Sequence, residues 1–181
     1  YFQGAAPVAQ AVPFSRGSSD LYLVTRLDGF AADDAVALID RAAAPSREGR
    51  ILLDQTAATA STAGNGWLAD AAARLADAGF ADRVVIEKTS RVLAGEKDVL
   101  GYYSWGSNDP AITRRRFDFG FVPGAIAGTY VSTDGRTFTE PPTAWTIGKW
   151  IDRSTFFAGS PQSLAGDLIR EGVTGVSAQV D

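Results

Sequence analysis

The sequence predicts a single α/β domain with three layers, in which helices cover both faces of a mostly parallel sheet. Several short runs of consecutive apolar residues are typical of strands that are buried on both faces. Segments whose apolar residues recur with helical spacing separate several of these runs, as in proteins with parallel sheets. The length of 181 residues fits one domain, and the composition, 45% hydrophobic and 21% charged, is ordinary for a globular protein.

Two segments at the start of the chain are interpreted separately from the domain. Residues 1–4, Tyr-Phe-Gln-Gly, resemble the remnant of an expression tag, and residues 5–17, rich in Ala, Pro and Val, are interpreted as a flexible leader. The single α/β domain is expected over residues 18–181. Because the chain stops directly after a predicted strand, we expect the natural protein to continue beyond Asp181.

The first half of the domain is predicted to contain three strands and two helices. The strands are the short apolar runs at residues 21–25, 50–54 and 83–86. The first helix begins near Asp33 and Asp34, which suit the positive end of a helix, and ends before Pro45. Its expected apolar face carries Val36, Leu38 and Ile39. The second helix spans residues 67–78, and Gly79 ends it.

The second half is predicted to add three strands and one helix. The strands lie at residues 98–105, 124–131 and 175–180, and Asp134-Gly135 indicates a turn of a small hairpin. The helix spans residues 161–170, with Pro161 in its first turn and Gly172 closing it.

The composition excludes several common chemistries. The chain contains no histidine and no cysteine, so no imidazole base and no thiolate nucleophile is available. Zinc, haem and iron–sulfur sites are therefore not expected, and we predict no metal and no cofactor. The net charge of −4 lacks the basic footprint of nucleic-acid binding. No stretch approaches the roughly 20 apolar residues of a membrane-spanning helix.

The carboxyl ends of the predicted strands form the expected functional edge, because parallel α/β sheets bind ligands there. The polar and aromatic residues that leave this edge are the candidate ligand-binding residues, namely Asp54, Ser104, Trp105, Ser107, Asn108, Asp109, Ser160 and Ser163. Residues 104–109 equally fit a turn that was selected for its backbone chemistry alone. Ser160 precedes the predicted helix, where it either caps the helix or exposes an anion-binding terminus; capping is the favoured interpretation.

A weaker motif precedes the second helix. Gly64-Asn65-Gly66 begins a G-x-G-x-x-A pattern, and Glu87 follows about twenty residues later, as in dinucleotide-binding folds. That fingerprint requires its first glycine directly after a strand, whereas about nine residues separate Gly64 from the strand ending at Asp54. A flexible glycine-rich loop is therefore the favoured interpretation, and nucleotide binding remains a minor alternative.

Segments across most of the chain resemble an uncharacterised family of exported bacterial proteins. The resemblance rests on residues 23–29 (LVTRLDG), 104–108 (SWGSN), 122–127 (VPGAIA) and 163–176 (SLAGDLIREGVTGV). It implies export to the periplasm or cell envelope after removal of a signal peptide. More distantly, the layout is similar to the caspase and gingipain class of cysteine peptidases, which implies a caspase-like or flavodoxin-like topology. In that comparison Trp105-Gly106 occupies the position of the catalytic His-Gly, and Gly159-Ser160 lies near the expected cysteine.

These observations lead to a favoured function and two alternatives. The favoured hypothesis is a non-catalytic caspase-like domain, a pseudoenzyme that binds a peptide or small polar ligand at the carboxyl edge of the sheet. One alternative is a hydrolase that uses Asp54 and Asp109 as acid and base, with Ser160 nearby. The other is nucleotide binding through Gly64 and Gly66. A serine needs an adjacent base to act as a nucleophile, so we predict no peptidase activity of the Cys-His type.

Overall fold

The computed structural model describes residues 2–3, 6–7, 24–58 and 62–180. Near the start of the chain, β1 (Phe2–Gln3) and β2 (Ala6–Pro7) pair in antiparallel fashion. The domain itself is built on one five-stranded sheet. Its strands are β3 (Arg50–Asp54), β4 (Val84–Glu87), β5 (Val99–Ser104), β6 (Phe121–Thr129) and β7 (Gly175–Ser177).

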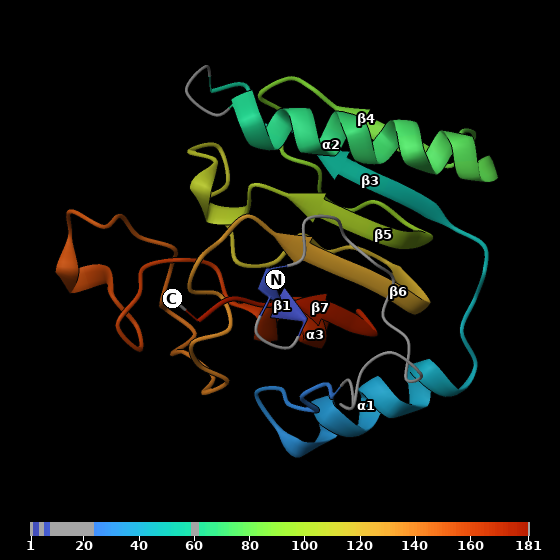
Figure 1. The fold of residues 1–181 in the computed structure, drawn as a ribbon. Helices are drawn as coiled ribbons and strands as arrows, with labels where there is room; N and C mark the ends of the chain where they lie inside the picture. Colours follow the sequence, from blue (N-terminus) through green and yellow to red (C-terminus); the bar gives the residue numbers. More distant parts are fainter. Residues whose placement is uncertain (1, 4–5, 8–23, 59–61, 181) are drawn as a thin grey trace.

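All neighbouring strands of this sheet are parallel, and their order is β4-β3-β5-β6-β7. Relabelled from the first strand of the sheet, the order is 2-1-3-4-5, which is the flavodoxin-like arrangement. The direction of strand growth reverses between β3 and β5, so the topological switch point lies at their carboxyl ends. The predicted three-layer α/β/α architecture with a parallel sheet is confirmed (Figure 1).

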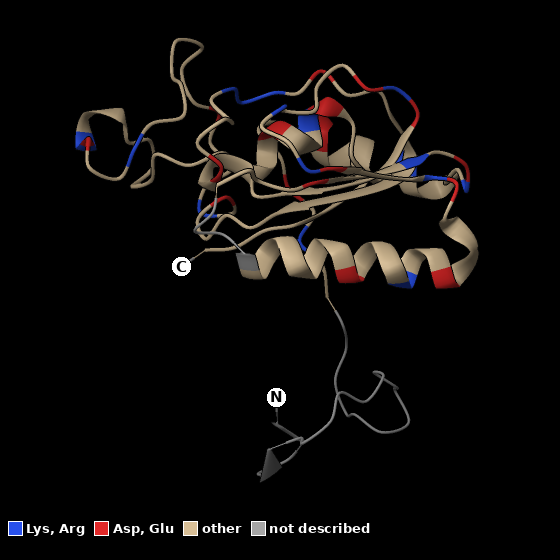
Figure 2. Ribbon diagram, turned by 90° about the horizontal axis from the view of Figure 1, so that it is seen from above, with Lys and Arg blue, Asp and Glu red and all other residues tan. Residues whose placement is uncertain are grey.

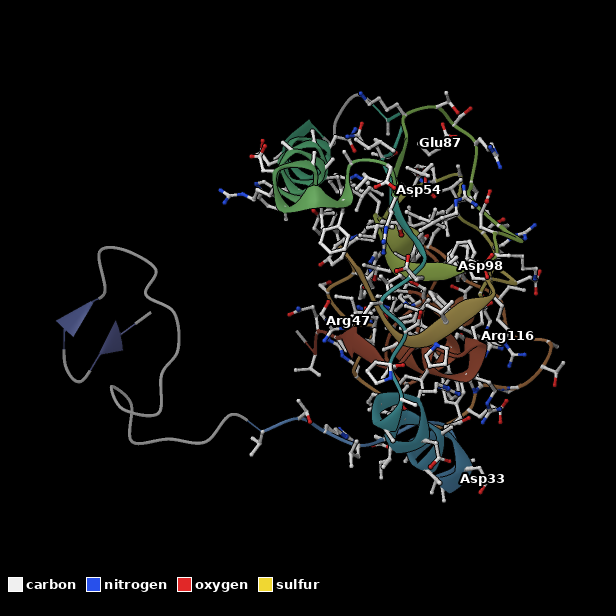
Figure 3. All side chains as sticks on the ribbon, turned by 90° about the vertical axis from the view of Figure 1, so that its right-hand side faces the viewer. Asp33, Arg47, Asp54, Glu87, Asp98 and Arg116 are labelled. Atoms are coloured by element: carbon white, nitrogen blue, oxygen red, sulfur yellow. The ribbon has the colours of Figure 1, made fainter. Side chains whose placement is uncertain are left out.

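In the described residues, three α-helices cover the two faces of the sheet to different extents. α1 (Ala32–Ala43) and α3 (Ala165–Glu171) pack on one face, whereas α2 (Thr62–Leu75) packs on the other, mainly against β3 and β4. Figure 3 looks along the sheet and shows α2 on one side, with the loops that carry Asp98 and Arg116 on the other. The crossover from β5 to β6 contains no α-helix and has only the 3₁₀ turn η2 (Gly106–Asn108).

The ends of α1 follow the predicted chemistry, but its apolar face is narrower than expected. The Asp34 carboxylate accepts the Ala31 N–H (2.9 Å), and Arg41 in the last turn donates to carbonyl groups at the end of α3. Leu38 is buried, but Val36 and Ile39 are 54% and 53% exposed. The prediction that all three face the core is therefore wrong for Val36 and Ile39.

Other predicted boundaries shift by several residues. α2 begins at Thr62 instead of Trp67, and a wide turn, η1 (Ala76–Phe80), ends it, with Gly79 at a φ of 89° as predicted for a terminating glycine.

Residues 24–25 of the predicted first strand are irregular and exposed, and residues 21–23 lie outside the described part of the chain. Asp134-Gly135 forms a turn, but no strand of a hairpin flanks it; the Gly135 N–H donates to the Gln179 carbonyl (2.7 Å).

The hydrophobic core consists of two clusters, one on each face of the sheet. The face that carries α1 and α3, together with the loops around Leu93 and Phe119, contains most of the buried apolar side chains. We call it the closed face. The face that carries α2 contains a small cluster around Leu53, Leu68 and Ala72, and we call it the open face. Among the described helices, none is long and apolar enough to cross a membrane.

Candidate functional site

The carboxyl edge of the sheet brings the predicted polar residues into one region. Asp54 lies opposite Glu87 of β4 and Ser104 of β5, and Ser104 lies opposite Thr129 of β6. Because paired residues of parallel strands point to the same side, this row faces the closed side of the sheet. Figure 3 shows Asp54 and Glu87 close together on adjacent strands.

The predicted serine and asparagine side chains are engaged in hydrogen bonds within the chain. Ser104 Oγ accepts the Gly106 N–H (2.9 Å), and Ser107 Oγ accepts the Ser163 N–H (3.0 Å). The side-chain oxygen of Asn108 accepts a hydrogen bond from Gln162 (2.8 Å). The bonds to Ser163 and Gln162 join the turn after β5 to the segment before α3. The turn interpretation of residues 104–109 explains these contacts without any ligand.

Ser160 does not cap a helix, because α3 begins five residues later at Ala165. Its hydroxyl contacts Thr133 Oγ1 and accepts the Gln162 N–H (3.1 Å), so it is buried in a polar network. The prediction of a helix over residues 161–170 is therefore wrong about where the helix begins, and Pro161 is not in its first turn. Within the described residues, no lysine or carboxylate hydrogen-bonds with Ser160.

Asp54 is the most perturbed group at this edge. Its side chain is 5% exposed, and a single donor among the described residues, the Leu93 N–H, reaches its Oδ2 (3.3 Å). Burial, together with the negative charges of Asp109 and Glu87, raises the pKa of Asp54 to about 6. Asp109 is also buried, and its Oδ1 accepts the Ala111 N–H (2.8 Å). The two predicted carboxylates therefore interact electrostatically.

The other buried aspartates of the closed face have more partners. Asp167 receives two hydrogen bonds from the guanidinium of Arg115, at 2.8 and 3.1 Å. Asp134 accepts bonds from the Thr129 hydroxyl (3.0 Å) and the Gln179 N–H (2.7 Å), and burial still raises its pKa to about 6. Asp54 thus differs from Asp167, because no described lysine or arginine forms an ion pair with it.

The Gly64-Asn65-Gly66 segment lies within α2, not in a loop after β3. A Cβ atom at Gly64 would lie 2.4 Å from the ring of Trp105, so the glycine allows the indole to pack on the helix. Asn65 Oδ1 accepts hydrogen bonds from Trp105 Nε1 (2.8 Å) and from the Thr56 N–H (3.1 Å). The motif therefore holds Trp105 and the loop after β3 in place.

A large cavity lies on the open face, away from the predicted polar residues. It is a groove of about 930 Å³ beside α2, over β5, β6 and β7. Its lining is almost entirely apolar and includes Ile51, Leu53, Leu68, Tyr103, Ile126 and Tyr130. Ile126 is 67% exposed there, and Gly101 and Gly175 add no side chains to the floor. Among the described residues, Arg74 is the one charged residue that lines the groove.

Aromatic side chains border the groove at the carboxyl edge. Tyr130 forms edge-on contacts with Trp67 (5.6 Å between ring centroids) and with Trp105 (5.3 Å), and it packs against Tyr103 (4.9 Å). Trp67 is 61% exposed. Trp105 is the one predicted site residue that contacts this border.

Sequence reasoning missed the groove because no single motif encodes it. One sequence signal was present. In residues 124–128 of β6, Gly124, Ile126 and Gly128 point to one face of the sheet, and Ala125 and Ala127 point to the other. A strand with so little side-chain volume facing outward leaves space unless another element covers it.

Among the described residues, no group of three or more acidic side chains is placed to hold a metal ion. No family model matches the chain, and comparisons with curated proteins and with solved structures find no match either.

Proposed function

We propose that this domain is a non-catalytic binding domain whose open face receives an amphipathic helical segment of a polypeptide. The observation that carries the proposal is the apolar groove of about 930 Å³ beside α2. The proposal retains the peptide ligand expected from the caspase-like resemblance but places it beside the edge, on the open face.

The architecture of the sheet favours a polypeptide ligand. Parallel sheets are normally covered by helices on both faces, because their strands are apolar on both sides. Here α2 packs mainly on β3 and β4, so β6 and β7 lack a helix on this side within the described residues. A helix lying beside α2 would cover Ile126, Tyr103 and Tyr130, which are the contacts of helix-in-groove recognition.

The lining also predicts the composition of the bound helix. The floor is flat where Gly101 and Gly175 lie, so large apolar side chains such as Leu or Phe can reach the sheet. Arg74 at the border of the groove favours an acidic residue on the bound helix. The tyrosine and tryptophan residues at the carboxyl edge provide large contact areas with little loss of side-chain entropy.

Selection from a displayed library of amphipathic helical peptides tests this proposal. The library is selected on the unmodified protein and then tested on Ile126→Asp, which places a charge in the groove. Ile39→Asp is the matched control, because Ile39 is also an exposed isoleucine but lies on α1. We expect selected peptides to bind Ile126→Asp at least tenfold more weakly and Ile39→Asp unchanged. Equal binding to all three proteins would contradict the proposal.

A second candidate function is carboxylate chemistry at Asp54 and Asp109. It is favoured by the raised pKa of Asp54, about 6, because a carboxyl group that titrates near neutral pH can act as a general acid or base. A panel of chromogenic glycosides and esters tests this candidate: turnover abolished by both Asp54→Asn and Asp109→Asn supports it, and absence of turnover rejects it for those substrates.

A further inference from the structure

A long segment between β6 and α3 projects from the body of the domain. The chain leaves the body of the domain after the buried Pro141 and rejoins it at the buried Ser160. In Figure 1 it is the orange segment at the left, and in Figure 2 it again extends outward on the left, so the two views agree that it protrudes. Because it follows β6, it protrudes from the side of the carboxyl edge.

Internal contacts hold this segment in a defined shape. Trp145 Nε1 donates to the Thr155 carbonyl (2.8 Å), and the Gly148 N–H donates to the Pro161 carbonyl (2.9 Å). The Asp152 carboxylate accepts the Ser154 N–H (3.0 Å) at the start of the 3₁₀ turn η3 (Arg153–Thr155). The end of the protrusion is therefore a structured turn.

The end of the protrusion exposes two large apolar residues in succession. Ile151 is 91% exposed and Trp150 is 52% exposed. Trp150 contacts Phe156 edge-on, with ring centroids 5.3 Å apart, which fixes its ring at the surface. We call residues 149–153 the tip. Adjacent exposed residues of this size on a protrusion are typical of an interaction site.

The charges of the tip are mainly positive. Lys149 and Arg153 flank the apolar pair, and neither forms an ion pair among the described residues. The acidic residue of the tip, Asp152, is engaged in the turn through Ser154. The tip thus combines an exposed tryptophan and isoleucine with two free cations, although the whole chain has a net charge of −4.

We propose that the tip docks this domain onto an anionic lipid surface. Tryptophan is favoured at the interface between lipid and water, and an exposed isoleucine gains free energy in the acyl region below it. Lysine and arginine beside them attract anionic headgroups. The tip lies on a protrusion (Figures 1 and 2), so it can reach a bilayer surface without hindrance from the body of the domain. A single inserted turn gives weak, reversible binding.

Co-sedimentation with vesicles tests the proposal. The unmodified protein is mixed with vesicles of phosphatidylcholine alone, or of phosphatidylcholine and phosphatidylglycerol in equal parts. We expect pelleting with the anionic vesicles that decreases as salt is added. Ile151→Asp should weaken it at least tenfold, and Lys149→Gln combined with Arg153→Gln should remove the preference for anionic vesicles. Ile39→Asp, which changes an exposed isoleucine on α1, should leave pelleting unchanged.

Three results would overturn the proposal. The first is no pelleting of the unmodified protein. The second is equal pelleting of the unmodified protein and Ile151→Asp, with circular dichroism confirming that both are folded. The third is self-association in the absence of vesicles that Ile151→Asp abolishes, measured by sedimentation equilibrium, because the tip would then contact protein. Groove binding of the selected helical peptides is independent of all three results.

Discussion

The two faces of the sheet differ in how completely the chain covers them. On the closed face, thirteen of the described residues form one buried cluster with α1, α3 and the loops around Leu93 and Phe119. On the open face, the corresponding cluster has three buried residues, and Ile126 is exposed beside a groove of about 930 Å³. The same strands supply both faces, so the difference comes from the crossovers that cover them.

We infer from this difference that the closed face determines the stability of the fold and the open face determines ligand binding. The closed face contains the buried core and the buried carboxyl groups, so changes there alter the free energy of unfolding. The open face contributes less to the core, so changes there alter binding with little effect on folding. Each prediction below tests one part of this division.

Removing a core aromatic ring from the closed face should have the largest effect. Phe119 is buried and contacts Tyr102 (4.8 Å between ring centroids) and Phe117 (5.4 Å). Phe119→Ala leaves a cavity and should lower the free energy of unfolding by roughly 3–5 kcal/mol. Ile126→Ala on the open face should change it by less than about 0.5 kcal/mol. Urea unfolding of both variants measures the contrast, and similar losses would show that the open face also forms core.

The pH dependence of stability should also originate on the closed face. The folded-state pKa of Asp54 is about 6, above its ordinary value of 3.8, because burial disfavours the charged form. Its stabilising contribution is therefore fully present below pH 3.8 and is lost as the pH rises through 6. Asp134 has a similarly raised pKa and the same sign.

Asp54→Asn isolates this effect. The amide can still accept the Leu93 N–H but carries no charge at any pH. We expect the variant to be more stable than the unmodified protein by about 3 kcal/mol at pH 7.5, with little difference at pH 4. Urea unfolding at the two pH values measures the difference. A gap that is equal at both would show that Asp54 keeps an ordinary pKa in the folded protein.

Filling the groove should change binding with only a small effect on stability. A Cβ atom at Gly175 would meet a single neighbour, Ile126 Cγ2, at an ordinary distance of 3.7 Å. Gly175→Val should therefore raise the free energy of unfolding by at most about 1 kcal/mol, since glycine weakens strands, while it blocks groove binding. Gly172→Val is the contrasting variant, because Gly172 has a φ of 118° that valine rarely adopts, so it should destabilise the protein. Unchanged peptide binding by Gly175→Val would place the ligand elsewhere.

Local sequence patterns predicted the elements whose determinants are local. The run Ile51-Leu52-Leu53 identified β3 because a strand buried on both sides needs apolar residues on both, and Gly79 marked the end of a helix because its φ is positive. The shift of α3 has a distant cause. Ser160-Pro161 has the local signature of a helix start, but the Ser160 hydroxyl bonds to Thr133, 27 positions earlier, and the helix begins only at Ala165.

The candidate site was predicted less well than the fold for the same reason. The position of Asp54 and Ser104 at the carboxyl edge follows from strand polarity, and the structure places them opposite each other. Whether Asn108 or Ser163 is free to bind a ligand depends on partners more than fifty positions away, which no local pattern records. The groove depends on the absence of a covering element, which is a property of the whole described chain.

Isoleucine methyl groups provide the most direct test of the open face as a binding surface. They lie on both faces: Ile51 and Ile126 line the groove, whereas Ile112 and Ile169 belong to the closed-face core. Methyl NMR spectra are recorded while a selected helical peptide is added to the unmodified protein. We predict shifts at Ile126 and Ile51 and none at Ile112 or Ile169. Peptide binding that leaves Ile126 unshifted would contradict the account.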